Sequence, residues 1–119
     1  MKAGEHVAKA MRVERSMHKL KPVEDYLAIV DASLVAGYHW GSALLHAHGV
    51  LADADHANTP SKLSIPVGQL PPAVQPAFAA FVELERLRAE YVRSPSRHLS
   101  GLEDRVWRAL KVMRRATEA

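Results

Sequence analysis

The chain contains no cysteine. That absence excludes disulfides, thiol nucleophiles, cysteine-based zinc sites and iron–sulfur clusters. No apolar run approaches the roughly 20 residues that cross a bilayer, and the first residues lead into no signal-peptide core. The sequence also lacks a Gly-x-Ser-x-Gly elbow, a glycine-rich phosphate loop and a dinucleotide fingerprint, so it offers no support for hydrolase, kinase or dehydrogenase chemistry. We expect a soluble, unprocessed, cytoplasmic protein that needs no membrane and no cofactor.

What is present is typical of one ordinary globular domain spanning residues 1–119. Hydrophobic residues make up 48% of the chain and charged residues 24%, and a chain of this length buries enough surface to fold without covalent or metal cross-links. Apolar residues recur at three- and four-residue steps in four segments, and strand-like alternation and internal repeats are absent. We therefore predict an all-α fold, a four-helix up-and-down bundle with one long connection between helices two and three.

The predicted helices span residues 3–20, 23–51, 72–93 and 101–117, and residues 53–72 form the long connection, with a short turn around Val67 to Leu70. Pro22 is expected to separate the first two helices, and Ser100 and Glu103 form a capping-box pattern before the fourth. The residues expected to face the core are Leu27, Val30, Leu34, Gly37, Gly41, Leu44, His48 and Leu51 in the second helix, Val74, Ala77, Phe78, Phe81, Leu84 and Tyr91 in the third, and Leu102, Val106, Ala109, Leu110 and Met113 in the fourth.

Two glycines lie one turn apart on the second helix. Gly37 and Gly41 each cost about 1 kcal/mol relative to alanine in a helix, which indicates a packing reason for them. With Trp40 beside them, we expect a tightly packed homodimer interface formed by Gly37, Trp40 and Gly41. The alternative is a monomer in which the first helix packs on this face.

Charge is unevenly distributed along the chain. Residues 1–21 hold six Lys or Arg and two Glu, residues 22–85 hold one Lys and seven acids, and residues 86–119 hold nine bases and four acids. If the first and last helices lie side by side, their outer faces form a basic stripe suited to phosphate backbones or an acidic partner. The alternative is that these charges only solvate the surface of the bundle.

Histidines are the other candidates for chemistry. His39 and His46 are seven residues apart and share a helix face, and Asp31, His18 and His56 are candidates for completing a site with them. No Glu-x-x-His or His-x-x-x-His pair anchors such a site, so we predict no metal centre. A small-molecule or metal-binding bundle around His39, His46 and His56 stays open as an alternative.

The end of the third helix is the most suggestive stretch, with four arginines and one histidine between residues 86 and 98. Together with the small and aromatic residues of segment 35–45, it resembles the HEPN superfamily of small helical bundles. Arg93 and His98, with four residues between them, match the family motif of Arg, four to six residues, then His. The resemblance implies metal-independent RNA cleavage in a dimeric cleft, in which His98 acts on the 2′-hydroxyl or the leaving oxygen and Arg93 steadies the phosphate.

These residue types suit that chemistry. A neutral imidazole such as His98 titrates near physiological pH, and the planar guanidinium of Arg93 can bind two phosphate oxygens. Arg88 and Arg97 are the candidates for holding the nucleic-acid backbone. The sequence thus favours engagement of RNA or a nucleotide phosphate, and endoribonuclease activity is the enzymatic form of that prediction. The competing class is a non-catalytic interaction module, either an adaptor or the antitoxin-paired half of a two-gene system, with a partner protein.

Overall fold

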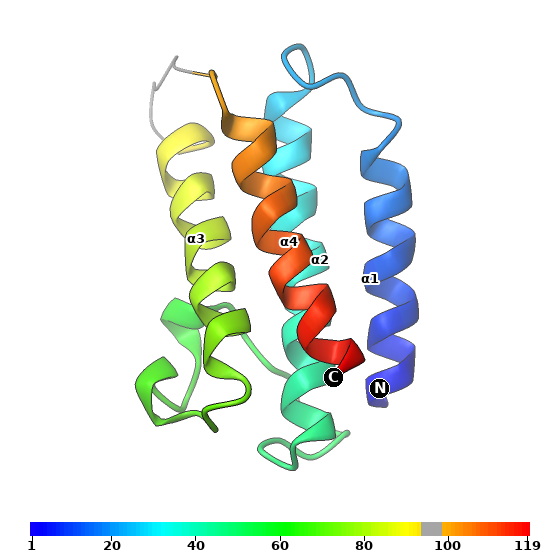
Figure 1. The fold of residues 1–119 in the computed structure, drawn as a ribbon, viewed down its shortest axis with the longest axis vertical. Helices are drawn as coiled ribbons and strands as arrows, with labels where there is room; N and C mark the ends of the chain where they lie inside the picture. The colour runs from blue at the N-terminus through cyan, green and yellow to red at the C-terminus, as the bar shows by residue number, and fades with distance from the viewer. Residues whose placement is uncertain (94–98) are drawn as a thin grey trace.

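The computed structural model describes residues 1–93 and 99–119, and within them the chain forms four α-helices that run alternately up and down (Figure 1). They are α1 (Ala3–Met17), α2 (Tyr26–Ala47), α3 (Gln75–Tyr91) and α4 (Leu102–Glu118). The predicted all-α four-helix bundle is confirmed. Within the same residues, no helix is both long enough and apolar enough to cross a membrane.

α2 is the central element of the bundle. It packs against α1, α3 and α4, whereas α3 and α4 pack on α2 and on each other. Thirteen of its 22 residues are buried, so α2 is covered on most sides, and an exposed strip remains at Leu27, Asp31 and Val35. Each neighbouring helix therefore takes its position from a different side of α2.

The core residues predicted for α3 and α4 are confirmed. Every one of these eleven side chains is buried, including Phe78, Phe81 and Leu110, which are fully enclosed. Both helices have one buried face. In an amphipathic helix of this kind, the spacing of the apolar residues predicts directly which positions are buried.

The core predicted for α2 is only partly right. Leu27 is 45% exposed, and His48 lies exposed just after the last helical turn. Both residues lie at an end of α2, where neighbouring helices do not cover them. His39 and Trp40, which lie off the predicted stripe, are buried instead, because α2 is covered on several sides.

The helix ends differ from the predicted ones for local reasons. Residues 22–25 form a turn before α2, in which the backbone amide of Lys21 donates to the Asp25 carboxylate over 2.8 Å. The capping box predicted at Ser100 and Glu103 is wrong. Gly101, with φ of 75°, is the residue that precedes α4, and no side-chain hydrogen bond from this N-cap position closes the helix start. Glycine adopts this left-handed conformation at little cost.

The connection from α2 to α3 is ordered by two short 3₁₀ turns, η1 (Pro60–Lys62) and η2 (Val67–Gln69), and the second confirms the turn predicted around Val67 to Leu70. Both turns pack on α3. Leu70 is buried, and the side-chain amide of Gln75 donates to the Leu70 carbonyl over 2.8 Å. The connection therefore forms a wall of the molecule against α3.

The two glycines of α2 serve packing within the chain. A Cβ added at Gly37 would lie 3.0 Å from Cδ1 of Phe81, and one at Gly41 would lie 3.2 Å from Cζ of Phe78. Trp40 is 1% exposed, and its Nε1 donates to Glu14 of α1 over 2.5 Å. The dimer interface predicted at Gly37, Trp40 and Gly41 is therefore corrected, because α3 and α1 of the same chain already cover these residues.

Gly37→Ala should lower the free energy of unfolding by about 1 kcal/mol, because an overpacking cost of roughly 1–3 kcal/mol exceeds the gain in helix propensity of about 1 kcal/mol. Urea unfolding at pH 7 measures the change. Gly4→Ala is the matched control, since Gly4 is also helical and a Cβ there meets nothing within 4 Å. Equal stability changes in the two variants would contradict close α2–α3 packing at Gly37.

Candidate functional site

A cleft between α2, α3 and the η1 segment brings together two of the arginines predicted from the sequence, Arg88 and Arg93. The cleft has a volume of about 520 Å³, and its wall also carries Arg86 from α3 and Lys62 from η1. Four cationic side chains thus border one cavity. The remaining polar lining comes from hydroxyl, amide and carboxylate groups of Tyr38, Asn58, Thr59, Ser61 and Glu85.

The four cations differ in how they are held. Arg88 donates through Nε to the Asp31 carboxylate of α2 over 3.1 Å, which fixes its guanidinium across the α2–α3 interface. Arg86 lies 3.7 Å from Glu83 in a largely exposed pair. Arg93 and Lys62 form no ion pair with any residue of segments 1–93 and 99–119, although the charge of Arg93 acts on the nearby Glu85 carboxylate. Both side chains therefore keep their N–H donors open to an anionic ligand.

Glu85 ties η1 to α3 at the base of the cleft. The Ser61 backbone amide donates to its Oε1 over 2.9 Å and the Ser61 hydroxyl to its Oε2 over 2.6 Å. Burial alone would raise the pKa of Glu85. The hydrogen bonds from Ser61 and Thr59 and the nearby charge of Arg93 outweigh that effect and lower the pKa from its usual 4.5. Glu85 is thus held as a carboxylate, and it fixes the segment that carries Lys62.

A second lobe of about 400 Å³ continues the cleft along α2. It shares Tyr38, Thr59 and Arg88 with the first lobe, and its other lining includes the aliphatic side chains of Leu34 and Val35. Val35 is 47% exposed and adds apolar surface to this lobe. The combined cleft therefore has a lobe with four cationic side chains and a more apolar lobe, and Tyr38 lines both.

The other predicted site residues are placed as follows. Arg97 and His98 lie outside the described residues, so Arg93 is the one member of the predicted catalytic pair that the structure locates. Lys62 was missed as a site residue because it comes from the long connection. One feature of the sequence could have pointed to Lys62, because it is the only Lys or Arg in the acidic segment of residues 22–85.

The histidines gather elsewhere. His39 and His46 do share a face of α2, as predicted, and that face meets His6 of α1, whose ring centroid lies 5.1 and 5.2 Å from theirs. His56 is exposed in the connection, and His18 stacks on Trp107 with ring centroids 4.2 Å apart. Across residues 1–93 and 99–119, no group of three or more His, Cys, Asp or Glu side chains is arranged to hold a metal ion.

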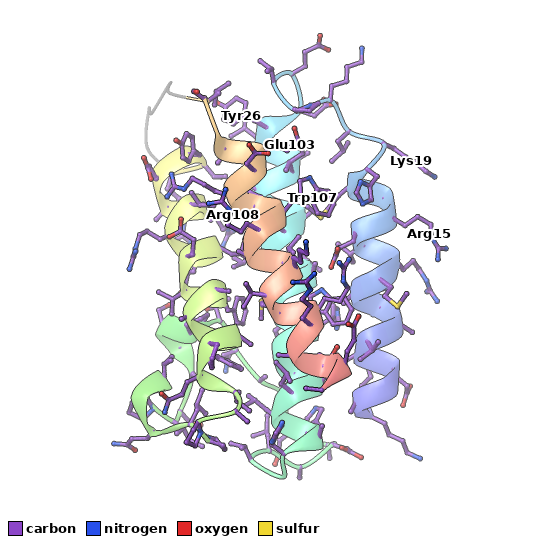
Figure 2. The ribbon with its side chains drawn as sticks, viewed as in Figure 1. Arg15, Lys19, Tyr26, Glu103, Trp107 and Arg108 are labelled. Atoms are coloured by element: carbon purple, nitrogen blue, oxygen red, sulfur yellow. The ribbon has the colours of Figure 1, made fainter. Side chains whose placement is uncertain are left out.

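The basic stripe expected along the first and last helices is not continuous. α1 and α4 do lie side by side, but Arg15 and Lys19 extend from the side of α1 that faces away from α4, while Trp107 points from α4 toward α1 (Figure 2). On α4, Arg105 binds Glu83 through Nη2 over 2.6 Å, and Arg114 lies 3.8 Å from Glu14. The Arg-lined cleft, where Arg93 and Lys62 have no ion-pair partner among the described residues, is thus the clearer candidate for an anion site.

Comparison of the chain with protein-family models, curated proteins and solved structures found no match. The HEPN resemblance therefore stays a prediction from the sequence.

Glu85→Gln should lower the free energy of unfolding by about 1 kcal/mol at pH 7, because a charged acceptor of two hydrogen bonds is lost from a partly exposed site. Since folding lowers the pKa of Glu85, its stabilising effect is complete above pH 4.5 and is lost as the pH falls through the lowered value. Urea unfolding of both proteins at pH 7 and pH 3.5 should show the difference shrinking in acid. Glu118→Gln, at the exposed end of α4, should show no such difference. A Glu85→Gln effect that is independent of pH would contradict this role.

Proposed function

We propose that the cleft between α2 and α3 binds the phosphate group of an RNA or a nucleotide. The observation that carries this proposal is that Arg88 and Arg93 border one cavity together with Arg86 and Lys62. Guanidinium groups bind phosphate oxygens through paired hydrogen bonds, and the fixed position of Arg88 reduces the entropy lost when a ligand binds.

Side chains must supply the attraction for the anion in this cleft. Arg93 follows the C-terminal end of α3, where the helix carries partial negative charge and repels a phosphate. Arg93 and Lys62 overcome that field because neither is neutralised by an ion pair among the described residues. The apolar lobe at Leu34, Val35 and Tyr38 offers a surface on which a base or sugar can pack beside the bound phosphate.

Ribonuclease activity is the catalytic form of this proposal. It rests on the resemblance to the HEPN superfamily and on the chemistry of the pair. Arg93 stabilises the negative charge that develops on the phosphate, and His98 transfers the proton at the 2′-hydroxyl or the leaving oxygen. The proposed reaction needs no metal ion, since the proton is carried by an imidazole and the charge is met by a guanidinium.

A non-catalytic interaction module is the second candidate, and one observation favours it. Leu27 and Val35 are 45% and 47% exposed and lie two turns apart on α2, with Asp31 between them. Exposed apolar side chains aligned along a helix suit a partner protein or a second copy of the chain.

Arg93→Gln should weaken the binding of a fluorescently labelled single-stranded RNA about tenfold, because it removes one of the four cationic side chains that border the cleft. Fluorescence anisotropy at 50 and 200 mM salt measures the affinity and should show a steep loss with salt in the unmodified protein. Arg15→Gln removes an equally exposed charge far from the cleft and should have little effect. Equal weakening by both variants, or binding that does not respond to salt, would contradict the cleft as the binding site.

RNA incubated with the purified protein and EDTA should be cut, and His98→Ala should abolish the cutting, because the proposal assigns the proton transfer to His98. Gel analysis of a defined RNA measures the product. Full activity in His98→Ala would reject the catalytic role of His98. Binding without cutting in the unmodified protein would reject ribonuclease activity and leave the phosphate-binding proposal in place.

A further inference from the structure

Three imidazole rings meet in the interface between α1 and α2. His6 is 5% exposed and His39 is 9% exposed, and their Nδ1 atoms lie 2.9 Å apart. His46 completes the cluster, with its side chain 1% exposed. Its Nδ1 lies 3.0 Å from the Leu51 carbonyl, and its Nε2 is buried without a hydrogen-bond partner among the described residues. Tyr38 is edge-on to both His6 and His39.

The attachment of α1 depends on such polar contacts. Its four buried residues are His6, Ala10, Glu14 and Met17, so half of them carry a titratable group. α1 packs mainly on α2, and its links to α4 include the Glu14–Arg114 pair and the His18–Trp107 stack. Val7, Val13 and Leu20 pack against the core beside Ala10 and Met17, so apolar contacts also hold α1. α1 docks mainly on one helix, whereas α3 and α4 each pack on two, so its attachment responds most to a change in its polar contacts with α2.

The contact between His6 and His39 limits how many protons the cluster can hold. A hydrogen bond between two Nδ1 atoms needs a lone pair on one of them, so it cannot survive when both rings are fully protonated. The groups around the cluster are the N-terminal ammonium, Glu5 and Lys9 from α1, His39, His46 and Tyr38 from α2, and Asp53 from the connection. Glu5 and Asp53 are the only acids among them.

The electrostatics of the cluster agree with its geometry. Burial, reinforced by His39, His46 and the N-terminal ammonium, lowers the pKa of His6 from 6.5 to about 4, with Glu5 opposing the shift. Burial and the charge of Lys9 also lower the pKa of His39. When α1 is released from α2, the pKa values of the two freed imidazole rings return toward their ordinary values. The state with α1 released therefore binds more protons than the state with α1 packed on α2, between about pH 4 and 6.5. The packing of α1 on α2 is therefore strongest above this pH range and weakens as the pH falls through it.

We propose that the histidine pair His6 and His39 is an acid-sensitive latch that holds α1 on α2 at neutral pH and releases it in mild acid. Release removes the packing behind Tyr38, a residue that lines both lobes of the Arg-lined cleft. The latch itself rests on the α1–α2 interface and holds whether or not the cleft binds a phosphate.

Hydrogen exchange of the full chain at pH 7 and pH 5, corrected for the intrinsic pH dependence of exchange, tests the latch. The central amides of α1 should lose about 20-fold in protection between pH 7 and pH 5, which is the effect of His6 alone, while those of α3 keep theirs. His6→Gln cannot titrate and should remove the drop. His48→Gln, an exposed histidine at the end of α2, should leave it unchanged. Parallel loss of protection in α1 and α3 would overturn the latch, as would a drop that persists in both His6→Gln and His39→Gln.

Direct titration of His6 in the unmodified chain by NMR keeps the proposal testable if the glutamine variants release α1 at every pH. A midpoint well below 6.5 supports the latch, and a midpoint at 6.5 or above overturns it.

Discussion

The burial of α2 on several sides is the constraint on which the rest of the structure depends. One helix must present a suitable surface to three neighbours at once, and its faces differ in kind. Toward α3 it offers the bare backbone of Gly37 and Gly41, and toward α1 it offers Trp40 and the histidine cluster. The outer edge at Val35 and Tyr38 is left for the cleft. Different faces of α2 thus form the close packing with α3, the proposed latch with α1 and one wall of the proposed binding site.

The sequence predicted best where a helix has a single buried face. All eleven core positions predicted for α3 and α4 are buried, because the apolar spacing on those helices has one physical cause, although the equally buried Leu87 was not among them. On α2, apolar spacing assigned Leu27 and His48 to the core and missed His39. A helix that is covered on several sides has no single line of apolar residues that marks its buried face. The helix ends were misjudged because the turn at Lys21 and Asp25 and the left-handed Gly101 depend on local hydrogen bonds and backbone angles.

The candidate site could be predicted only in part because its members come from distant segments. Arg88 and Arg93 are close in sequence, so their clustering was visible, whereas Lys62 joins them only because Glu85 holds η1 against α3. The histidine cluster has the same origin, since His6 and His39 are 33 residues apart. Composition and spacing reveal which groups can do chemistry, and the packing of α1 and of the long connection decides which of them meet.

The fit between Gly37 and Phe81 also has a consequence for how the sequence can change in evolution. Because the ring occupies the volume that a side chain at position 37 would need, enlarging one position alone costs stability. A lineage that acquires alanine or serine at position 37 regains that stability by reducing the residue at position 81. Relatives of this chain should therefore reveal the α2–α3 pairing through correlated exchange of side-chain volume, even where every charged residue of the cleft has drifted.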